Sequence, residues 1–325
     1  MMRSHAMTSL RRRIGAVLTA TAVAAGLALL GNPTPAEAAS PHQLRVITHN
    51  IAGGPDFRGS PMALYGVNTE IKKFSPDVVM LTEVCESQVR AFRKAHPSWH
   101  FRFTVMIDNQ RRCEEADGAT GQRQGQLLAS PHPMTGRYEH ELGYPDHGKP
   151  GDNPRRTKRF SLLCSDIAIP GHSATGLRAC VTHLRAFNSE EAHRAREAQT
   201  KRIREALHDV IWKQGKAVTV GGDFNAKPNW NAMDDLYRLN RDSSYTGRGD
   251  FHEADQTDPK YRKDHGSVTC GPKACRNGQP TKDTRKLDYV FISRNVTHRG
   301  RVSGLATDRY NSDHKLYRAL FEIRY

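Results

Sequence analysis

Three clusters of acidic, amide and imidazole side chains stand in the last third of the chain, each beside an apolar run. They are Gly222-Asp223-Phe224-Asn225, Lys286-Leu287-Asp288-Tyr289 and Ser312-Asp313-His314. Short apolar runs of this kind predict strands, and side chains at strand ends can meet in one pocket. Carboxylates bind hard cations, and an imidazole held by an acid suits proton transfer or charge stabilisation. The clusters therefore predict metal-assisted chemistry on phosphates.

Three earlier strand-like runs end in similar side chains. Asn50 follows the first run, Glu83 lies within the second, and His183 ends the third. Taken singly, Asn50 suits a turn and His183 suits a satisfied structural histidine. A carboxylate inside an apolar run is costly unless it is paired or metal-bound, which favours a functional role for Glu83. Six such groups at successive strand ends are hard to explain as structural residues alone.

The ordered set resembles the endonuclease/exonuclease/phosphatase superfamily. The resemblance spans about residues 44 to 323 and rests mainly on the Gly-Asp-Phe-Asn and Ser-Asp-His elements. It implies a four-layer α/β sandwich, in which two central mixed sheets are flanked by helices, formed by a single domain of residues 39–325. It also implies a metal-dependent phosphodiester hydrolase with its site at one edge of the sheets.

The resemblance also assigns roles to individual residues. Asn50, Glu83 and Asp313 are similar to the family's ligands for Mg²⁺, the expected cofactor, with Mn²⁺ and Ca²⁺ as alternatives. Asp223 and Asn225 resemble the pair that orients water and phosphate. His314, steadied by Asp288, and His183 resemble the two imidazoles beside the scissile phosphate. The sequence leaves open whether Asp223 or His314 takes the proton from water. Arg156 and Arg159 are candidates for the cationic phosphate contact of the middle strands.

Charge favours a polyanionic substrate. The chain carries a formal net charge of +15, and removal of residues 1–38 would take away four arginines and one glutamate, leaving +12. Lysine and arginine facing phosphates give affinity without reading bases. We therefore expect a monomeric endonuclease of low sequence specificity, with DNA favoured over RNA as its substrate.

Other activities of the same fold stay open. A phospholipid phosphodiesterase similar to bacterial sphingomyelinases needs an exposed aromatic or apolar protrusion, whereas this chain is only 7% aromatic and its long insertions are polar. Another phosphatase, or a catalytically silent binding protein, is a further alternative.

The N-terminus has the pattern of an export signal. Three arginines at 11–13 precede an apolar stretch from Ile14 to Leu30, and Ala36-Glu37-Ala38 fits a cleavage site. We expect residues 1–38 to be a signal peptide, the mature protein to be secreted, and no stable membrane insertion after cleavage. An uncleaved anchor is the alternative.

Six cysteines in an exported chain favour disulfides over metal ligands. Proximity in the sequence predicts the pairs Cys85 with Cys113, Cys164 with Cys180, and Cys270 with Cys275. A zinc site of Cys270, Cys275 and His265 is the alternative for the last pair.

Apolar, β-branched runs predict nine strands, separated in places by helices. The runs are Leu44–Ile51, Val78–Val84, Phe101–Ile107, Leu127–Ala129, Phe160–Ile169, Leu177–Leu184, Ala217–Val220, Leu287–Ile292 and Leu316–Ile323. One helix is predicted from Ser60-Pro61 and a longer one over Ser189–Lys213, with Asn188 and Glu191 as its cap. Its polar face, which is expected to be largely solvated, includes Arg194, Arg196, Lys201, Arg202 and Arg204. Residues 131–158 and 226–285 are expected to be surface excursions.

Overall fold

Two six-stranded sheets form the centre of the protein. The structure is a computed structural model, and it describes residues 42–110, 112–114, 122–146, 158–170, 176–240, 245–255, 276 and 278–323. The first sheet has the order β13-β14-β1-β2-β4-β3 and the second has the order β11-β12-β8-β7-β6-β5. Each sheet contains one parallel pair, β1 with β2 and β7 with β8, among antiparallel neighbours. Both sheets are therefore mixed, as predicted.

The strands and helices have well-defined bounds. The first sheet consists of β1 (His42–Asn50), β2 (Val78–Cys85), β3 (His100–Gln110), β4 (Gln122–Ser130), β13 (Thr297–Ala306) and β14 (Tyr317–Ile323). The second consists of β5 (Met134–Glu141), β6 (Ser161–Ile167), β7 (Leu177–His183), β8 (Ala217–Asp223), β11 (Phe251–Glu253) and β12 (Asp288–Ser293). A small separate pair is formed by β9 (Leu239–Asn240) and β10 (Tyr245–Thr246). The helices are η1 (Pro61–Leu64), α1 (Tyr65–Phe74), α2 (Glu86–Ala95), α3 (Glu190–Trp212) and η3 (Asn231–Asp235).

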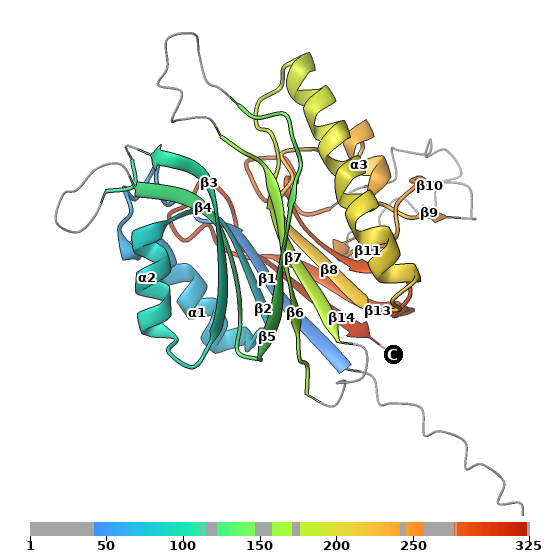
Figure 1. The fold of residues 1–325 in the computed structure, drawn as a ribbon, viewed down its shortest axis with the longest axis horizontal. Coiled ribbons are helices and arrows are strands. Elements are labelled where there is room, and N and C mark those ends of the chain that lie inside the picture. The colour runs from blue at the N-terminus through green and yellow to red at the C-terminus, as the bar shows by residue number, and fades with distance from the viewer. Residues whose placement is uncertain are drawn as a thin grey trace, which may run out of the picture. The chain divides into compact units, whose positions relative to one another are not determined.

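Helices cover the outer faces of the two sheets. In Figure 1, α1 and α2 lie on one side of the strands and α3 lies on the other. Successive side chains of a strand point to opposite faces. Val46 of β1 accordingly packs in the core between the sheets, while Ile47 packs in the core beneath α1 and α2. A third core joins the second sheet to α3 through Ile203 and Leu207. These three cores give the four layers that the family resemblance implies.

All nine apolar runs lie on strands, and both predicted helical regions contain helices. The first region begins as η1 and continues as α1. The predicted cap of α3 is wrong by one residue. Ser189 is the N-cap and accepts a hydrogen bond from the Ala192 amide, while Asn188 bonds to His193 instead. The polar face predicted for α3 is largely solvated, with Arg196 as a fully buried exception.

The expectation that residues 131–158 form a surface excursion is also wrong in part. Met134–Glu141 forms β5, an edge strand paired with β6. The sequence does not indicate this strand, because its side chains are mostly exposed and apolar residues do not alternate along it. Residues 226–285 include η3, β9, β10 and β11 within their described part.

Two of the predicted disulfides are present in the structure, linking Cys85 to Cys113 and Cys164 to Cys180. The second joins directly opposed residues of β6 and β7. Cys270 and Cys275 lie outside the described residues. Among the helices that the structure describes, none is both long and apolar enough to cross a bilayer.

Candidate active site

Strand register in the second sheet aligns three of the predicted residues. His183 ends β7, Asp223 ends the parallel strand β8, and Asp288 begins the antiparallel strand β12. His183 is registered with Asp223, and Asp223 with Asp288. The three side chains therefore stand in one row across adjacent strands, and all three residues are buried.

The first sheet supplies Asn50 and Glu83. Asn50 ends β1 and donates from Nδ2 to Glu83 Oε1 at 3.2 Å and to Asp223 Oδ2 at 3.1 Å. The second of these bonds joins the two sheets. Glu83 lies at a register shift of β2 and has a φ of 57°, an unusual conformation for this residue type. A bulge of this kind redirects a side chain, here toward Asn50.

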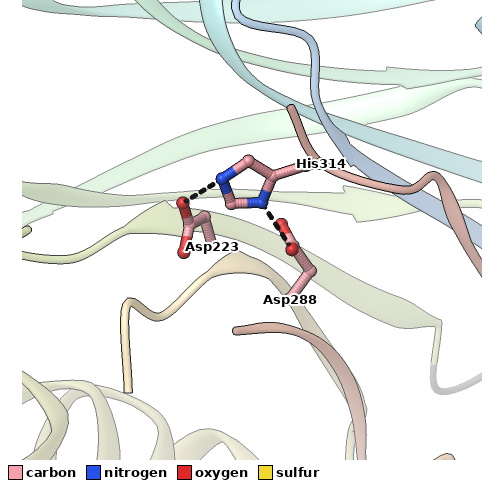
Figure 2. A group of neighbouring side chains, drawn as sticks. All are labelled: Asp223, Asp288 and His314. Atoms are coloured by element: carbon pink, nitrogen blue, oxygen red, sulfur yellow. Dashed lines mark hydrogen bonds and ion pairs between the residues drawn. The ribbon is translucent and has the colours of Figure 1, made fainter. Parts of the chain in front are cut away.

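His314 lies between two carboxylates, as Figure 2 shows. Its Nδ1 is 2.7 Å from Asp288 Oδ2, and its Nε2 is 3.7 Å from Asp223 Oδ2. The backbone of the preceding segment is also fixed, because Ser312 Oγ donates to the Asn50 carbonyl and accepts from the His314 amide. The Ser-Asp-His element therefore docks against the end of β1.

A lysine stands beside each histidine. Lys158 Nζ lies 3.4 Å from His183 Nε2, and His183 Nε2 lies 3.7 Å from Asp223 Oδ2. On the other side, Lys282 Nζ lies 3.1 Å from His314 Nε2 and pairs with Asp313. The site is thus bordered by two ammonium groups, which suits an anionic substrate.

The two lysines are the site residues that sequence reasoning missed. Both belong to basic stretches of the sequence, but no motif distinguishes them from neighbouring cations. Of the predicted arginines, Arg159 is exposed and its neighbour Lys158 faces the site instead. Arg156 lies outside the described residues.

Asn225 joins the site to the loop that follows β7. Its backbone N–H donates to Asp223 Oδ1 at 2.8 Å, and its side chain donates to the Leu184 carbonyl at 3.1 Å. A φ of 49° lets the chain turn sharply enough to make both bonds. Asn225 therefore fixes the Asp223 carboxylate.

The electrostatic environment separates the two histidines. Burial alone would lower the pKa of His314, but the charges of Asp288 and Asp223 outweigh it and raise that pKa to about 9. Burial, helped by the charge of Lys158, holds the pKa of His183 well below its ordinary value. At neutral pH His314 is an imidazolium and His183 is neutral.

Burial also raises the pKa of Asp223 to about 6, with the charge of His314 opposing the rise and that of Asp288 adding to it. Asp223 is therefore a carboxylate at neutral pH, with a basicity suited to accepting a proton near that pH. Its neighbour Asp288 keeps Oδ1 buried without a hydrogen-bond partner.

Two groups of side chains in the site offer atoms that could bind a cation. Asp223, Asp288 and His314 bring three potential ligand atoms within 4.8 Å of one another. Glu83 and Asp313 form the second group. The pKa of Asp56 is raised mainly by burial, and the negative charges of Asp313 and Glu83 raise it further. Carboxylate oxygens are the ligands suited to Mg²⁺ or a similar hard cation.

Comparison with known proteins decides the family. A model of the endonuclease/exonuclease/phosphatase family matches residues 47–314. The chain belongs to this family. Its members are hydrolytic nucleases and phosphatases, and the matched segment extends from β1 to His314, so it contains every strand end that contributes to the site.

Solved structures of the endonuclease/exonuclease/phosphatase fold agree with the architecture. The catalytic domain of human Nocturnin is 18% identical, with a TM-score of 0.59 over 86% of this chain and 94% of that one. A Bacteroides vulgatus family member is 16% identical, with a TM-score of 0.57 over 87% and 99% of the two chains. D. rerio TDP2 complexed with a single-strand DNA product is 15% identical, with a TM-score of 0.53 over 86% and 98%. No curated protein matches the sequence.

Proposed function

We propose that this protein is a divalent-metal-dependent phosphodiesterase that hydrolyses nucleic acid as an endonuclease of low sequence specificity. The observation that carries the proposal is the chain of contacts from Asn50 through Asp223 to His314 and Asp288, which unites both sheets at one point. Carboxylates, an imidazolium and two lysines around that point match the needs of phosphoryl transfer. Such chemistry depends mainly on positioning and charge stabilisation.

Each group in the site has a separate role in hydrolysis. Asp223 is placed to accept the proton of the attacking water, and the Asn225 amide holds its carboxylate in position. His314, kept protonated by Asp288, stabilises the negative charge that grows on the phosphate oxygens. Lys158 and Lys282 neutralise the same charge from either side. Neutral His183 accepts at Nε2 from the Lys158 ammonium and so orients that cation toward the departing oxygen.

Glu83 and Asp313 are the residues proposed to hold the metal. Glu83 is the half-buried carboxylate that accepts from the Asn50 side chain, and both Glu83 and Asp313 raise the pKa of Asp56 by their charge. Bound there, Mg²⁺ would act as a Lewis acid on a phosphoryl oxygen. The Asp223, Asp288 and His314 group is less suited to holding it, because His314 Nδ1 is engaged by Asp288 and the imidazolium would repel a cation.

Nucleic acid is the favoured substrate for two reasons. The chain is strongly basic, with a net charge of +15, and its site is bordered by lysines. A neighbour of the same fold, D. rerio TDP2, is complexed with a single-strand DNA product. The two described disulfides and the signal-like N-terminus support secretion of the mature protein.

The test is a parallel assay of purified residues 39–325 on plasmid DNA, RNA and sphingomyelin with Mg²⁺. We expect cleavage of DNA that EDTA abolishes. Release of choline phosphate from sphingomyelin with no cleavage of either nucleic acid would select the phospholipid phosphodiesterase instead. Asp223→Ala is the matched inactive control, since it removes the proton acceptor.

A further inference from the structure

Two exposed aromatic side chains stand in strained backbone beside the active site. Phe187 is 74% exposed at a φ of 75°, and Tyr144 is 48% exposed at a φ of 55°. Left-handed backbone is unfavourable for bulky residues, and exposure of an aromatic ring gains nothing for folding. Strain of this kind persists only where the surroundings enforce it. We call Tyr144 and Phe187 the aromatic rim.

A buried arginine enforces the conformation of the Phe187 loop. Arg196 of α3 is fully buried and donates from Nη1 to the carbonyls of Arg185 at 2.7 Å and Phe187 at 2.8 Å. Its guanidinium lies 5.0 Å from the ring centre of Trp230. Burial of a cation is costly, so these loop carbonyls are firmly held. The Phe187 ring is therefore presented to solvent by a rigid support.

The two loops of the aromatic rim are tied to each other through Arg185. Its Nη1 donates to the Pro145 carbonyl at 3.0 Å, directly after Tyr144. Gln199 joins the same loops, accepting from the Arg185 amide at 3.0 Å and donating to the Gly143 carbonyl at 3.3 Å. Arg185 thus links the two loops that carry the exposed rings, and the guanidinium of Arg202 lies 5.9 Å from the ring centre of Tyr144.

The aromatic rim adjoins the His183 side of the site. Phe187 is four residues beyond His183, a path of at most about 14 Å. The loop starts at Leu184, which bonds to both Asp223 and Asn225. The Tyr144 loop is bridged to the site by paired backbone bonds between Asp146 and Lys158, whose ammonium faces His183. A strand held at the site can therefore reach both rings.

We propose that Tyr144 and Phe187 stack on nucleobases of a single-stranded nucleic acid whose phosphate is held at the active site. This inference rests on the proposed function and narrows its substrate class. Rigid aromatic rings interleaved with arginines are the usual platform for single strands, whereas bases of a duplex are already stacked. Membrane insertion fits less well, because the ion pair of Arg185 with Asp146 belongs to the same two loops as the rings and would enter the interface with them.

The test compares oligonucleotides of equal length with normal bases and with abasic sugars, using residues 39–325. Cleavage is measured with Mg²⁺ and binding with EDTA. We expect wild type to favour the base-bearing strand by roughly 5- to 150-fold for each stacked base. Tyr144→Ala/Phe187→Ala should lose that preference while abasic cleavage stays unchanged, and Phe187→Trp should keep it. Trp212→Ala is the matched control, since this exposed ring ends α3, about 33 Å from the helix start.

Several outcomes separate this inference from the proposed function. An undiminished base preference in the double variant, at an unchanged melting temperature, overturns the stacking role. Loss of binding to sphingomyelin vesicles in the double variant, without a change toward oligonucleotides, overturns it in favour of a membrane. Base-dependent binding that needs Phe187, with no cleavage by wild type, supports stacking while contradicting nuclease activity.

Discussion

The two active-site histidines occupy opposite electrostatic environments although both are buried. Both lie 3.7 Å from Asp223 and beside a lysine ammonium, but only His314 has a second carboxylate, Asp288, at 2.7 Å from its Nδ1. A protonated His314 cannot take a proton from water, so this environment favours Asp223 as the base, a question that the sequence leaves open. The sequence shows residue types, but the charge state follows from neighbours that only the fold brings together.

The pH dependence of cleavage distinguishes the two candidate bases. Asp223, whose pKa is raised to about 6, must be ionised, and His314, whose pKa is raised to about 9, must be protonated. We expect kcat to rise as the pH increases through about 6 and to fall as it passes about 9. Asp288→Asn removes the charge that sustains the imidazolium and should move the upper limb to lower pH. A rate that instead climbs through about pH 9 would make His314 the base.

Metal affinity should respond to Glu83 more than to Asp288. Glu83→Gln removes a hard anionic ligand and should raise the Mg²⁺ concentration for half-maximal cleavage by roughly tenfold or more. Asp288→Asn, which disturbs the His314 pair, should lower kcat at nearly the same Mg²⁺ requirement. Magnesium titration of both variants checks this. The reverse pattern would place the cation among Asp223, Asp288 and His314.

At the scale of elements, strand ends were the most predictable part of the molecule. Buried runs such as Val78–Leu81 lack polar interruptions, so composition alone predicts them. β5 could not be found this way, because an edge strand with one exposed face carries ordinary polar residues. Arg196 was assigned to solvent for a related reason. The charge of its side chain suggests solvent, although its position four residues after Ala192 and seven before Ile203 places it on the apolar face of the helix. The loop carbonyls and the Trp230 ring account for its burial.

Gly222 shows how closely β7 and β8 approach beside the catalytic row. At a φ of 139°, a Cβ there would lie 1.8 Å from the Thr182 carbonyl oxygen. Gly222→Ala should lower the free energy of unfolding by about 2–4 kcal/mol and displace His183 and Asp223 together. Gly215→Ala is the control. Gly215 also has a positive φ, of 66°, but a Cβ there would have no atom within 4 Å. We therefore expect this substitution to lower the free energy of unfolding by only about 1 kcal/mol. Equal losses of unfolding free energy in the two variants, measured by urea unfolding, would contradict this explanation.

At the scale of the whole molecule, the site exists only where the two sheets meet. Asn50 and Glu83 belong to the first sheet, and His183, Asp223 and Asp288 belong to the second. Residues 264 positions apart, Asn50 and His314, both contact the Asp223 carboxylate. The order of motifs in the sequence could suggest this convergence through a family resemblance. The positions of Lys158 and Lys282 could not be predicted in the same way, because both lysines reach the site from loops outside these motifs.

The salt dependence of DNA binding tests whether Lys158 and Lys282 contact phosphates of the substrate. Each phosphate neutralised by a lysine adds about 0.9 to the slope of log K against log salt. Lys158→Gln and Lys282→Gln, which remove the two ammonium groups beside the histidines, should each weaken binding uniformly across sequences and reduce the slope by about 1. Lys201→Gln, at an exposed α3 lysine paired with Glu205, should change neither. A slope that falls equally in all three variants would mean that the general positive charge, rather than the two site lysines, holds the strand.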